Sequence, residues 1–270
     1  MRRHWNSVTA FILLTSLGLA SLTAGELADK GREIFNKQQR TVVTIHVVLK
    51  LSSGSGGSRE SQQDITGTII DPSGLTVLAL SACDPTEMTR RLTPDYNIES
   101  EVTDVKILVD DAELPAEIVL RDKDLDLAYV RPKTKPATPM AAVDLGKSGT
   151  ALPLDEVIAL NRLNKAASRA YAASAGNVAA VIQKPRTFYI PDGMSSAAFG
   201  APVFLLDGKI LGIFVRRAVG GGGGSSRDNI TSIILPAEDI LKGAKQAAEP
   251  KGDSEKSSEK SSEKKEETKK

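Results

Sequence analysis

Apolar and polar residues alternate in short runs along most of the chain. The first run lies at 41–50, where Val43, Ile45, Val47 and Leu49 share one side of an extended backbone and polar residues fall between them. A period of two is typical of a strand with one buried face. This segment therefore predicts the first strand of a sheet.

Further runs of this kind predict short strands separated by turn residues. They cover residues 68–70, 75–80, 105–109, 115–120, 126–130, 156–160, 176–183, 201–206, 209–216 and 230–235. The turns Asp71-Pro72-Ser73-Gly74 and Asp207-Gly208 have the composition of tight hairpin connections. Many short strands joined by such turns predict an all-β fold, either a barrel or a sandwich.

The segments between and around these strands have other compositions. The Gly/Ser-rich segment 52–63 predicts a flexible connection, and residues 84–104 predict an irregular charged loop. Residues 26–40 predict a short N-terminal helix or linker, and residues 237–248 a closing helix. The tail at 249–270 repeats Ser-Ser-Glu-Lys units and is predicted to be disordered.

The N-terminus has the organisation of an export signal. A positively charged start precedes an apolar segment at 8–22, and small residues suit a cleavage site between Gly25 and Glu26. Residues 1–25 are therefore predicted to be a signal peptide, and the folded part to be exported, either periplasmic or secreted. An uncleaved N-terminal membrane anchor is the alternative, and no membrane contact is expected beyond this segment.

The composition argues against several classes of function. A net charge of +1 gives no long-range field that would attract nucleic acid, and aromatic residues make up only 4 % of the chain. Cys83 is the one cysteine, so an intramolecular disulfide is impossible. No cluster of His, Cys, Asp and Glu has the spacing of a metal site, so neither a metal nor a cofactor is expected.

The hairpin at residues 67–83 resembles the one that presents the catalytic histidine in trypsin-like serine proteases of the HtrA/Deg family. The segment 122–130 (DKDLDLAYV) resembles the family's segment with an Asp before Leu-Ala, and 146–160 resembles its Leu-Gly-Asp-Ser…Val-Gly-Asp segment. The resemblance extends over residues 38–245. It implies a trypsin-like double β-barrel with short flanking helices and no PDZ-type module after it. The implied domain covers 41–245, with barrel one at 41–132, barrel two at 140–236 and the closing helix at 237–248.

The resemblance also places the catalytic positions, and most of them are changed. Ser81 stands where the family has its histidine, and Asp126 keeps the carboxylate. Phe199 stands where the family's Gly-Asn-Ser-Gly-Gly-Pro motif has its serine, and a phenyl ring has no nucleophilic atom. Ala197 and Ala201 replace glycines of that motif, which alters the turn that aims oxyanion-hole N–H groups. The resemblance therefore implies a pseudoprotease.

Other residues offer weak substitutes for this machinery. His46 is the one histidine after the signal segment, and it is expected on the solvent face of the first strand rather than as a base. Ser195 and Ser196 precede the changed motif and could supply a displaced nucleophile, although no base is near; a polar loop is the alternative. Cys83 is expected to be a packed thiol rather than a nucleophile.

Arg216 and Arg217 follow a strand that borders the substrate cleft in the family. They are candidates for binding an acidic peptide or a peptide C-terminus, and exposed arginines at a strand end are the alternative.

Two functions remain open. One is an exported protein that binds a peptide or protein partner through its protease shell without catalysis; the other is an active serine endopeptidase with a displaced site. The absence of a suitable histidine favours the first.

Overall fold

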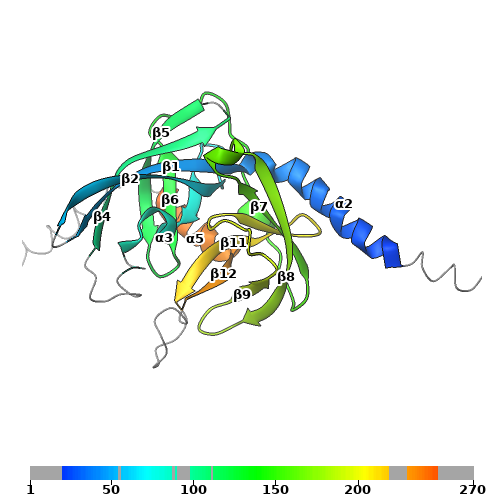
Figure 1. Cartoon of the computed structure of the whole chain (residues 1–270). Coiled ribbons are helices and arrows are strands. Elements are labelled where there is room, and N and C mark those ends of the chain that lie inside the picture. The colour runs from blue at the N-terminus through cyan, green and yellow to red at the C-terminus, as the bar shows by residue number, and fades with distance from the viewer. Residues whose placement is uncertain are drawn as a thin grey trace, which may run out of the picture.

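The strands of the chain close into two antiparallel barrels that lie side by side (Figure 1). The computed structural model describes residues 20–53, 56–86, 89, 98–110, 112–218 and 230–248. Barrel one has the strand order β1-β2-β3-β6-β5-β4, and barrel two the order β10-β11-β12-β9-β8-β7. The prediction of a trypsin-like double β-barrel is therefore confirmed.

Each barrel contains six strands, and helices accompany them. Barrel one comprises β1 (Val42–Ser53), β2 (Gly56–Ile69), β3 (Thr76–Ala79), β4 (Ile98–Val109), β5 (Ala112–Asp122) and β6 (Leu127–Pro132). Barrel two comprises β7 (Glu156–Arg162), β8 (Tyr171–Ile182), β9 (Phe188–Asp192), β10 (Pro202–Leu205), β11 (Ile210–Ala218) and β12 (Ile230–Pro236). The helices are α2 (Ala20–Gln38), α3 (Leu80–Cys83) and α5 (Ala237–Ala248), and single 3-10 turns lie at η1 (Gln39–Thr41), η2 (Leu145–Lys147) and η3 (Lys165–Ala167).

The Gly/Ser-rich segment 52–63 is strand wherever the structure describes it, and the end of the predicted loop at 84–104 is strand from residue 98 onward, so the prediction was wrong for both of these parts. β2 begins at Gly56, inside the Gly/Ser-rich segment, and pairs with β1 from Ser53↔Gly56 to Val42↔Thr68. β4 begins at Ile98 and pairs with the other edge of β1. Because β1 lies between these strands, backbone hydrogen bonds to an apolar central strand hold polar sequence in the sheet. The strand β9 was not predicted, because its short sequence contains Pro191, a residue that usually argues against a strand.

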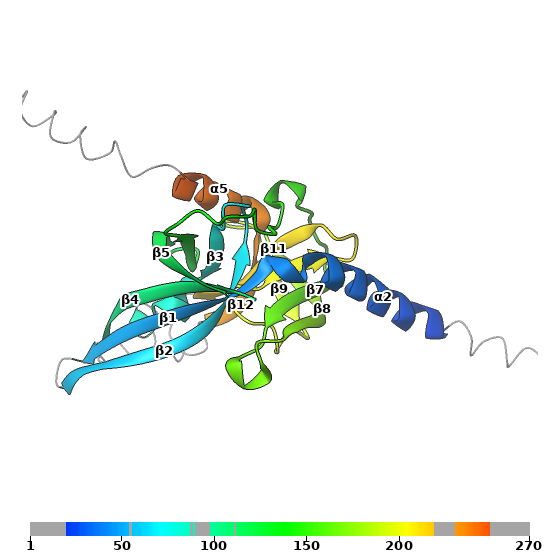
Figure 2. The same ribbon diagram turned by 90° about the horizontal axis from the view of Figure 1, so that it is seen from above.

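The long strands β1, β2 and β4 extend beyond barrel one as an arm. In Figure 2 this arm and helix α2 project to opposite sides of the two barrels. Within β1, the apolar positions Val43, Ile45, Val47 and Leu49 belong to the core of barrel one. The alternation read from this strand therefore assigned its buried face correctly.

Helix α5 packs between the two barrels and joins their cores. Ile240 is fully buried, and its backbone carbonyl accepts a hydrogen bond of 2.8 Å from the hydroxyl of the buried Tyr129 in β6. Gly243 faces the same tyrosine, and a Cβ at this position would collide with the phenol ring. The sequence predicted this helix with the bounds that the structure gives it.

At the N-terminal end, helix α2 starts within the segment predicted to be a signal peptide and continues to Gln38. Ile34 is buried where the second half of this helix meets barrel two. Among the described residues, no helix is both long enough and apolar enough to cross a membrane. The apolar segment at 8–22 lies almost entirely outside the described residues, and the tail at 249–270 lies wholly outside them.

Candidate functional site

The hairpin between β2 and β3 positions the first residue of the site. Gly74 has a φ of 92°, which closes the turn, and the N–H of Ile70 donates to the carbonyl of Leu75 at 2.8 Å. Because β3 pairs with β6, the chain leaves the sheet at Leu80 beside the start of β6. The single turn α3 follows, and Ser81 lies in it at the mouth of the gap between the barrels.

Ser81 and Asp126 form a direct contact. The Ser81 backbone N–H donates to Asp126 Oδ1 at 2.6 Å, and its hydroxyl donates to Oδ2 at 3.0 Å. The backbone N–H of Arg216 in β11 also donates to Oδ2, at 3.0 Å. Burial raises the pKa of Asp126, while the hydrogen bonds from Ser81 and Arg216 oppose that rise. The carboxylate therefore ties α3, β6 and β11 together across the two barrels.

Residues 197–201 form the loop that carries Phe199. Gly200 has a φ of 93°, and a Cβ there would strike the backbone carbonyl of Thr66. The backbone N–H groups of this loop are largely committed inside the protein. The N–H of Ala197 donates to the carbonyl of Met194 at 3.0 Å, and that of Ala198 to Asn161 Oδ1 at 2.9 Å. The N–H of Gly200 donates to the carbonyl of Phe214 at 2.7 Å, and that of Ala201 to the carbonyl of Ala198 at 3.0 Å.

The Phe199 ring lies against residues of β11. Its centroid is 5.2 Å from that of Phe214, and the two rings are parallel to within 6°. The guanidinium of Arg216 lies 4.1 Å from the Phe199 centroid, which is a cation–π contact. The position expected to hold a nucleophile is therefore filled by an aromatic ring with an arginine over it.

A cleft of about 440 Å³ opens between the barrels at this point. Its walls are apolar in part and carry cationic and polar side chains from both barrels. The lining residues are Thr44, Gln63, Asp64, Ile65, Thr66, Ser81, Ala82, Pro85, Arg162, Leu163, Asn164, Ala198, Phe199 and Arg216. The expected site residues Ser81, Phe199 and Arg216 therefore lie in one cleft.

Comparisons with known proteins agree with the double-barrel fold. A family model described as "Trypsin-like peptidase domain" matches residues 34–213. The chain belongs to the trypsin-like peptidase family. Among solved structures, it is similar to the apo form of the MamO protease domain from Magnetospirillum magneticum, with a TM-score of 0.50 and 18 % sequence identity. That match covers 77 % of this chain and 98 % of the MamO domain, and it supports the fold. No match to a curated protein was found.

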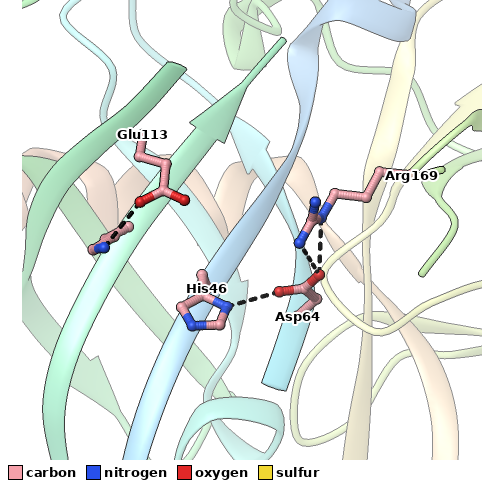
Figure 3. A network of polar contacts seen from close by, with 5 residues as sticks. His46, Asp64, Glu113 and Arg169 are labelled. Atoms are coloured by element: carbon pink, nitrogen blue, oxygen red, sulfur yellow. Dashed lines mark hydrogen bonds and ion pairs between the residues drawn. The ribbon is translucent and has the colours of Figure 1, made fainter. Parts of the chain in front are cut away.

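His46, the one histidine among the described residues, contacts Asp64 rather than Asp126. His46 Nδ1 lies 2.8 Å from Asp64 Oδ1, and the Arg169 guanidinium lies 2.8 Å from Asp64 Oδ2 (Figure 3). Burial alone would raise the pKa of Asp64, but hydrogen bonds from His46 and Arg169 outweigh it and lower the pKa. His46 was expected on a solvent face. The structure instead leaves 26 % of its side chain exposed, because Asp64 and the segment carrying Arg169 lie beside it.

Figure 3 also shows Glu113 on the same side of the barrel-one sheet as His46. Glu113 is exposed and forms an ion pair of 2.9 Å with Lys106, the residue directly opposite His46 in β4. Sequence pattern could not reveal the contact between Asp64 and Arg169, because the two residues are far apart in the chain and belong to different barrels. The pairing of His46 with Asp64 follows from the register of β1 and β2.

The other candidate nucleophiles occupy separate positions. Ser196 is exposed, and its hydroxyl lies 2.8 Å from that of Ser174. Ser195 is also exposed. Cys83 is fully buried, and burial raises the pKa of its thiol to about 12. The expectation of a packed thiol therefore agrees with its position.

Arg217 does not lie in the cleft with Arg216, although both were candidates for binding a peptide. It is not among the residues that line the cleft, and its guanidinium lies 5.1 Å from the ring centroid of Phe188. Consecutive residues of a strand point to opposite faces, so Arg216 and Arg217 cannot both enter the same cleft from β11. Within the described ranges, no group of three or more His, Cys, Asp or Glu side chains is placed to hold a metal ion.

Proposed function

We infer that this chain is a catalytically inactive, exported member of the trypsin-like peptidase family that binds a peptide or protein partner through the cleft between its barrels. The observation that carries this inference is the contact between Ser81 and Asp126. In a serine protease the carboxylate orients a histidine, and here a serine hydroxyl and backbone N–H groups use its oxygens instead. The export signal remains the sequence-based expectation for residues 1–25.

The backbone of the loop that carries Phe199 supports the same inference. An oxyanion hole needs N–H groups aimed at the position where negative charge develops. The N–H groups of Ala197, Ala198, Gly200 and Ala201 donate to acceptors within the protein. These groups are therefore engaged in holding the loop rather than directed at a ligand.

The competing function is that of an active serine endopeptidase with a displaced site. It requires a nucleophile with a base within hydrogen-bond reach. Ser196 pairs with Ser174, and His46 pairs with Asp64. Neither contact joins a nucleophile to a base, so this arrangement favours binding over hydrolysis.

A serine-hydrolase probe separates these two functions. The purified chain is incubated with a fluorophosphonate probe and, in parallel, with unfolded casein, after circular dichroism has established that it is folded. We expect neither labelling nor cleavage. Labelling that is lost in Ser195→Ala, Ser196→Ala or His46→Ala would establish a displaced catalytic site and refute the proposed inactivity.

Binding through the cleft needs its own experiment. Ala198 lines the cleft and is half-buried, so Ala198→Trp places an indole inside it. We expect a pool of random-sequence peptides to bind the unchanged protein and to lose that binding in the variant. An exposed alanine outside the cleft, Ala173→Trp, serves as the matched control. Equal retention by both variants would show that any peptide binding lies elsewhere.

A further inference from the structure

Two arginines in the cleft have no ion-pair partner among the described residues. Arg162, at the end of β7, lies with its guanidinium 4.0 Å from the ring centroid of Tyr171. Arg216 lies over Phe199 in the same way. Stacking on a ring fixes the plane of a guanidinium and leaves its N–H edge available for a ligand.

The cleft also holds unused hydrogen-bonding capacity. In the part of the chain that the structure describes, the buried side-chain polar atoms without a partner are Thr44 Oγ1 and Arg162 Nε. Both residues line the cleft. Buried polar groups in folded proteins nearly always find a partner, so the coincidence of both atoms at one site points to a polar ligand there.

The charge balance decides the sign of that ligand. Asp64 is the one carboxylate residue among those that line the cleft, and it already pairs with Arg169 and His46. Asp126 accepts the backbone N–H of Arg216 rather than its guanidinium. Arg162 and Arg216 therefore form no ion pair with a described carboxylate, and Asp126 attracts the charge of Arg216 only at longer range, in a cleft whose walls include the apolar side chains of Leu163 and Phe199. An anion is the complementary group, because its attraction to arginine is strengthened beside apolar walls.

We propose that the cleft recognises a carboxylate of its peptide ligand, held by Arg162 and Arg216, with the Thr44 hydroxyl as a further polar contact. This proposal rests on the proposed function, since it names the group by which the peptide is bound. A planar carboxylate matches the fork of an arginine side chain. Two sources have this chemistry, namely a free peptide C-terminus and an Asp or Glu side chain.

Three fluorescent peptide pools of equal length test the proposal with the full chain. The first has neutral side chains and a free C-terminal carboxylate. The second is the same pool with an amidated C-terminus, and the third is amidated with one central Glu. We expect the first or the third pool to bind at least about tenfold more tightly than the second, measured by fluorescence anisotropy. The pool that binds more tightly identifies the source of the carboxylate.

Substitutions assign the effect to the two arginines. Arg162→Met and Arg216→Met keep much of the length of the side chain and remove its charge, so the preference over the amidated neutral pool should disappear. Arg217→Met is the matched control, because this neighbour stacks on Phe188 and does not line the cleft. Arg216→Lys keeps the charge without the planar fork and should retain only part of the preference. Circular dichroism establishes that each variant is folded.

The outcomes separate this proposal from the one on which it rests. Equal binding of all three pools, blocked by Ala198→Trp, would overturn carboxylate recognition and leave peptide binding in the cleft intact. A preference that survives in Arg162→Met and Arg216→Met would also overturn it. Absence of binding by every pool would overturn both proposals together.

Discussion

The carboxylate of Asp126 should be a structural group whose removal lowers stability. Its oxygens accept two backbone N–H groups and one hydroxyl, all from Ser81 and Arg216. The informative change is Asp126→Asn rather than Asp126→Ala. Asp126 has a φ of 57°, and asparagine tolerates this left-handed conformation whereas alanine would add backbone strain of about 1–2 kcal/mol.

The magnitude follows from the hydrogen bonds that asparagine cannot make. With one oxygen in place of two, the asparagine side chain would leave at least one N–H or hydroxyl without its acceptor and set an amide N–H₂ against a donor. A lost acceptor for a buried donor costs about 1–3 kcal/mol, and relief of the buried charge offsets part of it. We expect a net loss of about 1–2 kcal/mol for Asp126→Asn. Ser81→Ala removes only the hydroxyl contact and should cost about 0.5–1.5 kcal/mol.

Urea unfolding followed by far-UV circular dichroism measures these losses. Tryptophan fluorescence is a poor probe, because Trp5 is the one tryptophan and belongs to the segment predicted to be a signal peptide. The free energy of unfolding is compared at a common denaturant slope. Asp126→Asn that is as stable as the unchanged protein, or more stable, would refute the argument that this carboxylate holds α3 and β11 together.

Three further predictions test other parts of the structure. Gly243→Ala should lower stability by about 1–3 kcal/mol in urea unfolding, because its Cβ collides with Tyr129, although alanine is the better helix former; the exposed Lys242→Ala should change it little. Arg169→Met should cost about 1 kcal/mol at pH 7. Because the pKa of Asp64 is lowered in the folded state, this loss of stability should be fully present above the unfolded pKa of about 3.9 and should vanish as the pH falls through the folded-state pKa. A loss of stability that persists in acid would contradict this reasoning. Native Cys83, with its pKa raised to about 12, should react with iodoacetamide at pH 8 at least about a hundredfold more slowly than in the unfolded chain, as mass spectrometry can measure.

The alternating pattern of β1 was enough to predict its strand and its buried face. Burial of every second side chain is a local property, so the sequence alone carries it. The hairpin at Gly74 and the turn at Gly208 were predictable for the same reason, because only the local backbone conformation is at stake. Strand pairing depends on residues that are far apart in the chain, so the sequence pattern did not predict it. At the Gly/Ser-rich start of β2, backbone pairing with β1 overrides a composition that favours a loop.

At the site, the sequence supplied the residues and the tertiary structure decided their contacts. The residue types at Ser81 and Phe199 were enough to predict the loss of a base and of a nucleophile. The alternation along β11 could have separated Arg216 from Arg217, but which of them faces the cleft depends on how the two barrels pack.

Arg162 and Thr44 had no signal in the sequence. They line one cleft from different barrels, and the approach of residues so far apart in the chain depends on how the two barrels pack. The strand pattern of the sequence predicted an all-β fold, and its resemblance to a family predicted the double barrel, which the structure confirms; the assignment of Ser81 and Phe199 to changed catalytic positions stays a prediction. Only the tertiary structure brought two unpaired arginines and an unpartnered hydroxyl into one cleft, because charge balance and hydrogen-bond satisfaction are properties of side chains in space.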